Sequence, residues 1–401
     1  MKFAKLSLAA IMAMGISAFA DVNVKFDGDA KLYYSTSDKG ANIDLFSREG
    51  AMAQTALNLG GALELPEGVQ GRVSLTMLST LGLEGQLVNS VWDAGIGSQW
   101  WASEAWLAKS FGNTTLKVGR QELDTPFAFT EKWSIAQNTF EAAVALNNDI
   151  ENTTIVAAFV GRGNGNQGTG AGVVSSSLNV VNNVVNNVDP FSTYFSDGAY
   201  ALGAVTTAIP STTLQAWYYD IVSTAQAWWL QADVTLEDLN GVGFGIQYAG
   251  ITPDDRISAL ATDDSSAIAV KVSGKIEGVS LSAAYSTVDS GNALNIANTA
   301  TILGGAPQSK LYTEAWWNYG HVGRAGTDSY NITASYSLEN GTDFGLYFTS
   351  ADHEGTTPDL TEFAATASKS YGAIDTTLAY ILAEDNQNYH NTLQVYLTYN
   401  F

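Results

Sequence analysis

The sequence has 401 residues, of which 40 are acidic and 18 basic, so that its formal net charge is −22. This balance argues against a nucleic-acid partner, because such proteins neutralise phosphates with a basic surface, and the 11% of aromatic residues argues against a disordered chain. The chain has no cysteine, so disulfides cannot hold it together.

The first 20 residues resemble a secretory signal peptide. Lys2 and Lys5 precede an apolar run (residues 6–16), and Ala18 and Ala20 supply the small residues of a cleavage site. We expect export by the Sec route and cleavage after Ala20, which leaves residues 21–401 with 16 basic and 40 acidic side chains and a net charge of about −24. The alternative is a buried N-terminal helix.

Eighteen segments of about ten residues alternate between apolar and polar side chains, a period that indicates strands with one apolar face. They span residues 22–35, 55–65, 72–78, 103–111, 114–120, 141–147, 153–161, 198–208, 212–221, 227–236, 242–250, 267–276, 279–288, 330–338, 342–350, 360–369, 373–382 and 392–401. No run after the leader approaches the roughly 20 apolar residues of a membrane helix. The sequence therefore predicts an all-β protein of about 18 strands.

The connections between these strands alternate in length. Short connections rich in Gly, Asn and Pro lie at residues 66–68, 112–113, 148–152, 209–211, 237–241, 277–278, 339–341 and 371–372. Most of the others are much longer, such as 36–51, 79–102, 121–140, 162–197, 251–266 and 289–329. This is the organisation of a transmembrane antiparallel up-and-down β-barrel with short periplasmic turns and long extracellular loops. The alternative is a soluble sandwich or propeller, whose turns need not segregate in this way.

The last segment, TLQVYLTYNF, shows what such a barrel would contact. Leu393, Val395 and Leu397 share one parity, and Gln394 belongs to the other. In a closed barrel with a water-filled interior the apolar parity must face lipid. Phe401 at the rim suits an interfacial aromatic girdle.

Two stretches resemble a known family. LKVGRQELDTPFAFTEKWSIAQNTFEAAVALNN (residues 116–148) and KLYTEAWWNYGHVGRAGTDSYN (residues 310–331) are similar to outer-membrane porins of the porin D type, especially to the major outer membrane protein porins of epsilon-class proteobacteria. The resemblance implies an 18-stranded barrel, a homotrimer, and a third long loop folded into the lumen, here about residues 121–140.

A barrel of about 18 strands is too wide to discriminate between small solutes unless something narrows it. The third long loop combines a proline with aromatic rings and charges that could do so. Its candidate constriction residues are Glu122, Asp124, Phe127, Phe129, Glu131, Lys132 and Trp133. The alternative is an ordinary surface loop.

Parity predicts which charges face the lumen. If Val73 and Leu75 face lipid, Arg72 faces inward. The same count places further charges inside: Lys25, Lys31, Lys117, Lys271, Lys275, Asp27, Asp29, Glu64, Glu104, Asp233, Asp343 and Asp375. A basic wall around Arg72 opposite an acidic loop would set a transverse field that biases ion passage. The alternative is that these charges are solvated and have no selective role.

Arg120 departs from this count. The parity of Leu116 and Val118 would aim its guanidinium at lipid, so we expect Gly119 to interrupt the strand register. With that interruption Arg120 joins the candidate lumen residues.

Other motifs carry less weight. GNGNQG (residues 163–168) matches a nucleotide-binding pattern, but an Asn-rich stretch follows it in place of a helix. The histidines, His321, His353 and His390, have no metal-ligand spacing. We expect no cofactor. The one alternative is Ca²⁺ at the acidic pairs of a single long connection: Asp254, Asp255, Asp263 and Asp264.

These features favour a passive diffusion channel for ions and small hydrophilic solutes, integral to a bacterial outer membrane, in contact with its lipid and lipopolysaccharide. The alternatives are a substrate-selective channel, an adhesin, and a barrel enzyme such as a phospholipase or protease. An enzyme would have to use His353 or His390, and neither has a recognisable nucleophile motif beside it.

Overall fold

The computed structural model describes residues 23–40, 42–79, 98–133, 135–164, 166–167, 192–195, 197–239, 241–257, 263–290, 295–301, 306–355, 358–385 and 388–401. The expected signal peptide, residues 1–20, and most of the Gly- and Asn-rich stretch after residue 163 lie outside these ranges.

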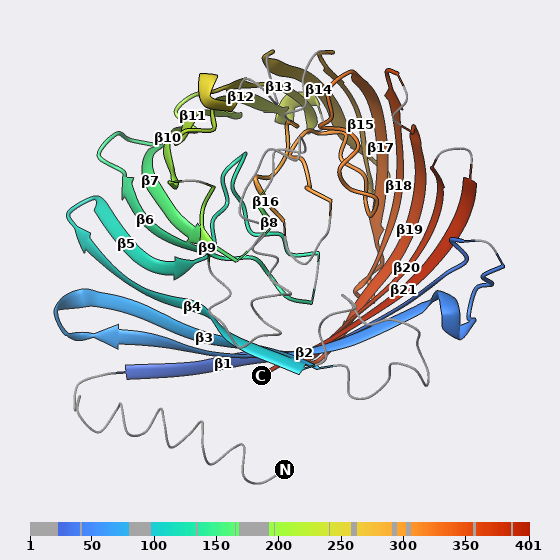
Figure 1. The fold of residues 1–401 in the computed structure, drawn as a ribbon, viewed down its shortest axis with the longest axis horizontal. Coiled ribbons are helices and arrows are strands. Elements are labelled where there is room, and N and C mark those ends of the chain that lie inside the picture. Colours follow the sequence, from blue (N-terminus) through green and yellow to red (C-terminus); the bar gives the residue numbers. More distant parts are fainter. Residues whose placement is uncertain are drawn as a thin grey trace, which may run out of the picture.

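Eighteen strands in the described residues form one closed antiparallel barrel (Figure 1). They are β1 (Asn23–Ser37), β2 (Ala51–Leu65), β3 (Val69–Ser79), β4 (Ser98–Phe111), β5 (Thr114–Gln121), β6 (Phe140–Asn147), β7 (Thr153–Gly163), β10 (Ala199–Thr206), β11 (Thr212–Ile221), β12 (Ala225–Leu236), β13 (Val242–Pro253), β14 (Ser265–Ile276), β15 (Val279–Val288), β17 (Thr327–Ser337), β18 (Thr342–His353), β19 (Leu360–Tyr371), β20 (Ile374–Asp385) and β21 (Asn388–Asn400). Each pairs with the next, and β1 pairs with β21 to close the ring. The predicted fold class is confirmed, and each predicted segment falls on one of these strands.

The remaining regular elements are short. β8 (Asn166–Gln167) and β16 (Ala300–Thr301) pair with each other inside the ring (Figure 1), and β9 (Ser192–Thr193) pairs antiparallel with the end of β7. Single 3₁₀ turns lie at Arg48–Gly50, Pro66–Gly68, Glu237–Leu239 and Asp255–Ile257. Among the described residues, no helix combines the length and the apolar character needed to cross a membrane.

The two faces of the barrel differ as the alternation predicts. On β14 the side chains of Ile268, Val270 and Val272 are each more than two-fifths exposed on the outer face, whereas Lys271 between them pairs with Asp233 of β12 at 3.1 Å. An apolar outer belt around a polar interior is the pattern of a barrel that spans a membrane.

The last strand follows the same rule. Gln394 is fully buried inside, whereas Tyr399 and Phe401 are 50% and 53% exposed. Phe401 also donates its backbone N–H to the carbonyl of Gly28 at 3.0 Å and accepts one from the Gly28 N–H at 2.9 Å. The aromatic terminus therefore completes the seam between β1 and β21.

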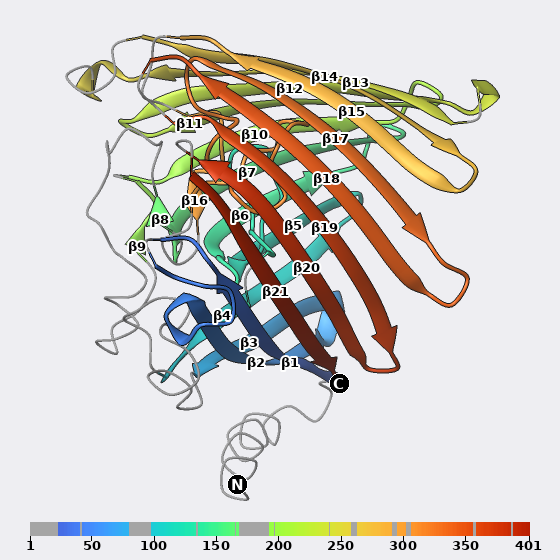
Figure 2. The same cartoon turned by 90° about the vertical axis from the view of Figure 1, so that its right-hand side faces the viewer.

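Short turns lie together at one end of the barrel. Figure 2 shows the connections β14–β15, β17–β18 and β19–β20 at the same end as the C-terminus. In the two-residue turn between β14 and β15, Glu277 and Gly278 both have positive φ, 50° and 86°. Such a turn matches the right-handed twist of the flanking strands.

At the opposite end several strands extend beyond the predicted segments. β13 continues to Pro253, three residues past the alternating part, because its inward residues Ala249 and Ile251 are apolar and buried beneath an internal segment. β4 begins at Ser98 and contains an irregularity opposite Ser74 and Leu75. Alternation fails where the lumen face is itself apolar or where a bulge shifts the parity.

Candidate functional site: two internal segments across the bore

The connection between β5 and β6, residues 122–139, runs inside the barrel and is called the first inward segment (Figure 1). Phe127 is 1% exposed, and its ring lies edge-on to Tyr219 of β11 and Trp229 of β12, with centroids 5.5 and 5.8 Å away. Further along, Ile135 is buried in a second cluster on the opposite wall. That cluster comprises Tyr33, Ala56, Leu78, Trp101, Ile135 and Ala136. The segment therefore contacts both walls.

The second inward segment, residues 295–326, is part of the connection between β15 and β17, and residues 295–301 and 306–326 of it are described. Its main anchor is the buried carboxylate of Glu362 on β19. Glu362 accepts the backbone N–H groups of Trp316, Trp317 and Asn318 at 2.7, 3.0 and 2.7 Å, and the Asn318 side-chain amide at 2.7 Å. Bonds to a buried charge are stronger than neutral ones, so this carboxylate holds the segment to the wall.

The two inward segments are bonded to each other. Asn298 donates its side-chain amide to the Phe129 carbonyl at 3.0 Å and to Glu131 Oε1 at 2.9 Å. The Thr299 N–H reaches the Phe127 carbonyl at 2.8 Å. Together they form one internal layer across the bore.

Aromatic rings add a second contact between the segments. Trp133 of the first lies edge-on to Trp317 of the second, with centroids 5.7 Å apart, and 5.5 Å from the Tyr319 ring. Trp133 also donates its indole N–H to Glu131 at 3.0 Å. The rings therefore add a contact between the segments to the hydrogen bonds from Asn298 and Thr299.

The predicted charges of the first segment are paired. Lys132 lies 2.6 Å from Glu122, and Asp124 forms an ion pair with Lys310 of the second segment. The Lys310 ammonium also lies 4.8 Å from the centre of the Phe129 ring. Glu131 is fully buried. Lys310 was not among the predicted site residues, because nothing local connects it with a residue 186 positions earlier.

Arg72 lies in a mixed network. Its guanidinium donates to Glu104 at 2.7 Å and to the two carboxylate oxygens of Asp27 at 2.6 and 2.8 Å. Lys117 lies 4.2 Å above the Trp106 ring, whose N–H donates to Glu104 at 3.1 Å. The wall around Arg72 is therefore ion-paired, in contrast to the basic surface that parity predicts.

Arg120 is bonded to the next strand. Gly119 before it has a φ of 126°, so the backbone is irregular at the residue where a register break was expected. The Arg120 guanidinium donates to Glu141 of β6 at 2.7 Å and to the Ala102 carbonyl at 3.2 Å, and Arg162 of β7 donates to the same Glu141 at 3.1 Å.

The second segment also carries a buried acid that the sequence argument missed. Glu314 accepts the Ala315 N–H at 2.9 Å and the Ser309 N–H. Burial, together with the neighbouring carboxylates of Glu362 and Glu131, raises the pKa of Glu314 to about 8. Glu314 is therefore mostly protonated at pH 7.

Two histidines that are distant in sequence meet at the end of the barrel with the long connections. The Nδ1 of His321 lies 3.2 Å from the Nε2 of His353, whose other nitrogen is 2.7 Å from the Thr327 hydroxyl. Burial lowers the pKa of His321 to about 4, and Arg324 adds to the effect. Thr327 is only 1% exposed, so this hydroxyl cannot reach a substrate as an enzyme nucleophile would.

Of the four acids suggested for Ca²⁺, Asp254 is already bonded to a neighbouring arginine. Asp254 is bonded in a fork to Arg256 at 2.7 and 2.9 Å, which lowers its pKa to about 2. Within the described ranges, no three His, Asp or Glu side chains gather as metal ligands would.

No family model and no curated protein matches the sequence. Solved structures with the same fold include three from Pseudomonas aeruginosa. OccK8 (OprE) is 14% identical with a TM-score of 0.75, covering 94% of this chain and 98% of its own. OccK9 (OpdG) is 13% identical with a TM-score of 0.74 and coverages of 95% and 98%. OpdK with vanillate is 11% identical with a TM-score of 0.70 and coverages of 96% and 99%. At these identities the likeness concerns the fold, an 18-stranded barrel like that expected from the resemblance to porin D-type porins.

Proposed function

We propose that this protein is a channel in a bacterial outer membrane through which small hydrophilic solutes diffuse, and that its two inward segments make it selective. The observation that carries the proposal is the internal layer in which Asn298 and Trp317 of one segment contact Glu131 and Trp133 of the other. An 18-stranded barrel without such a layer would leave a wide aqueous pore. A bore narrowed from two directions favours a substrate-selective channel over a general diffusion pore.

The constriction is built to stay in place. Phe127 is held between rings of β11 and β12, and the second segment is bonded to Glu362 on β19. Neither segment can move out of the bore without breaking these contacts. We therefore expect solutes to be selected by their size and by the contacts that they make with the two segments. Passage needs no catalysis, and we propose no enzymatic activity or cofactor.

The membrane location rests on the apolar outer belt and on the fold shared with OpdK, an outer membrane protein. In this location the belt contacts lipid and the outer leaflet supplies lipopolysaccharide. The homotrimer and the Sec-dependent leader remain predictions from the sequence, as does an adhesive role for the long connections.

Planar bilayer recording tests the proposal. The purified protein should insert as discrete, reproducible conductance steps, and the reversal potential under a salt gradient should report its ion preference. Protein that has been unfolded by boiling is the control and should give no steps. Correctly folded protein that inserts but never conducts would contradict the proposal.

A further inference from the structure

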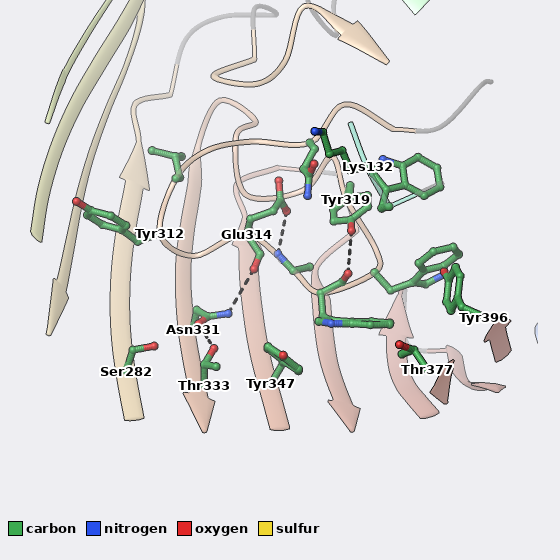
Figure 3. Close-up of a pocket in the computed structure, with 16 residues that line it drawn as sticks. Lys132, Ser282, Tyr312, Glu314, Tyr319, Asn331, Thr333, Tyr347, Thr377 and Tyr396 are labelled. Atoms are coloured by element: carbon green, nitrogen blue, oxygen red, sulfur yellow. Dashed lines mark hydrogen bonds between the residues drawn. The ribbon is translucent and has the colours of Figure 1, made fainter. Parts of the chain in front are cut away.

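A cavity of about 610 Å³ lies between the second inward segment and the inner wall of β15, β17, β18, β20 and β21 (Figure 3). Sites for small molecules commonly enclose about 300–1,000 Å³, so this cavity has the size of a ligand site. Lys132 and Trp133 of the first segment complete its lining. Both inward segments and the barrel wall therefore build it.

The wall side of the cavity is a row of neutral polar groups. Ser282, Thr333 and Tyr347 are direct partners across β15, β17 and β18, so their side chains share the lumen face. Thr377 of β20 and Tyr396 of β21 are likewise paired. Figure 3 shows these side chains along one row of strands. Thr333 already donates to Asn331 at 3.1 Å and Tyr396 to Gln394 at 3.2 Å, so these hydroxyls offer their acceptor lone pairs to a ligand.

The opposite side is aromatic and held in place. The Trp316 ring lies 6.1 Å from the Tyr347 ring, and the Tyr319 hydroxyl donates to the Trp316 carbonyl at 2.9 Å. Glu362 fixes the backbone of Trp316 and Trp317. Rings held before a ligand arrives lose little conformational entropy on binding.

The charge balance of the cavity excludes a strong preference for anions. Lys132 is the one cation among the lining residues that the structure describes, and it is paired with Glu122 at 2.6 Å. Glu314, the acid of the lining, is mostly protonated at pH 7. A carboxylate ligand would lose its hydration without meeting an unpaired positive charge, which costs free energy.

We propose that this cavity is a binding subsite for a neutral sugar of one or two rings. Trp316 and Tyr347 line the cavity with aromatic surface against which the C–H groups of a pyranose ring can pack. The Ser282 hydroxyl can bond the sugar hydroxyl groups, as can Thr333, which accepts because it already donates to Asn331 at 3.1 Å. The inference deepens the proposed channel function and names the solute class of its pathway.

Two measurements with glucose, maltose and vanillate test it. Titration of tryptophan fluorescence in detergent reports binding without requiring conduction, and sugar-induced block of the ion current in planar bilayers reports binding inside an open channel. We expect both sugars to act in the millimolar range, with vanillate weaker at equal concentration. Tyr347→Leu and Trp316→Leu should each raise the half-effect concentration about 5-fold, as expected for one lost ring contact.

Trp106→Leu is the matched control, because it removes a ring from the β4 wall outside the cavity, and its half-effect sugar concentration should stay at the wild-type value. Trp316 lies in a connection and Tyr347 in a strand, so a folding defect in one variant leaves the other informative. Conducting channels that neither sugar blocks or quenches would overturn the sugar site, as would tighter binding of vanillate. Sugar-dependent fluorescence in a protein that never conducts would instead support the site and contradict the channel.

Discussion

The lumen has two unlike walls. On β1, β3 and β4, Arg72 is held by Asp27 and Glu104 at 2.6–2.8 Å, so the surface consists of paired charges. On β17, β18 and β21 the corresponding surface consists of hydroxyls and rings such as Thr333, Tyr347 and Tyr396. Charges act over a Debye length of about 8–10 Å, whereas rings act only in contact. The first wall is therefore suited to ion preference and the second to recognition of uncharged solutes.

The comparison also shows how one architecture accommodates both chemistries. Backbone hydrogen bonds hold each strand to its neighbours whatever the side chains are, so inward positions can vary while outward positions must stay apolar. The first inward segment contacts both sides, because Ile135 packs against β1, β3 and β4 and Trp133 lines the cavity in front of β17, β18 and β21. It therefore couples the two kinds of surface.

Deleting residues 124–138 should have the largest effect, because it removes most of the first inward segment from the bore. We expect single-channel conductance to rise about two-fold or more and larger solutes to pass, since conductance grows with the open cross-section. The barrel should still fold, because the segment contributes no barrel strand. The control is deletion of residues 42–45 in the connection between β1 and β2. Unchanged conductance and solute cutoff in a folded variant would place the constriction elsewhere.

Arg72→Glu tests the charged wall. Three carboxylates would then lie together without their arginine, so the cation-to-anion permeability ratio should rise about two-fold in a confined, poorly screened field. The reversal potential under a salt gradient measures this ratio. Arg256→Glu makes the same charge change at an exposed residue beside Asp254 and should shift the potential much less. Equal shifts of the reversal potential in the two variants would show that the position of Arg72 is not important for ion preference.

Glu362→Gln tests how the second segment is held. The variant loses the charge from the bonds to Trp316, Trp317 and Asn318 and should weaken the local structure by about 2 kcal/mol. Amide exchange in residues 316–318 should then accelerate about 30-fold. Glu354→Gln, at an exposed residue, is the control. Unaltered exchange would mean that other contacts hold the segment.

The smallest effect should come from pH. Burial raises the pKa of Glu314 from 4.5 to about 8, so the protonated form stabilises the packed position of the second inward segment. This contribution is fully present below about pH 4.5 and is lost as the pH rises through about 8. Current noise should therefore increase modestly between pH 6 and pH 9, and Glu314→Gln should remove the dependence. A pH response that persists in the variant would assign it to another group.

The barrel could be predicted because its signals are local. Alternation in β21 from Leu393 onward and positive φ at turns such as Glu277 and Gly278 follow from neighbouring residues. The strand ends were predicted less well, because Ile251 is apolar on the lumen face where a segment remote in sequence covers it.

The candidate site, too, could be predicted from the sequence only in part. Residues 116–148 and 310–331 could be singled out from the sequence through their resemblance to porins, and the composition of the first block already combined rings with charges. Nothing in the chain order joins Asp124 to Lys310 or Trp316 to Glu362, because these contacts span 186 and 46 residues. The sequence by itself thus determined the strands, the turns and the apolar outer belt, which depend on neighbours in the chain. Only the tertiary structure decided which charges are paired and where the rings enclose a cavity, because those depend on how closure of the barrel brings distant segments together.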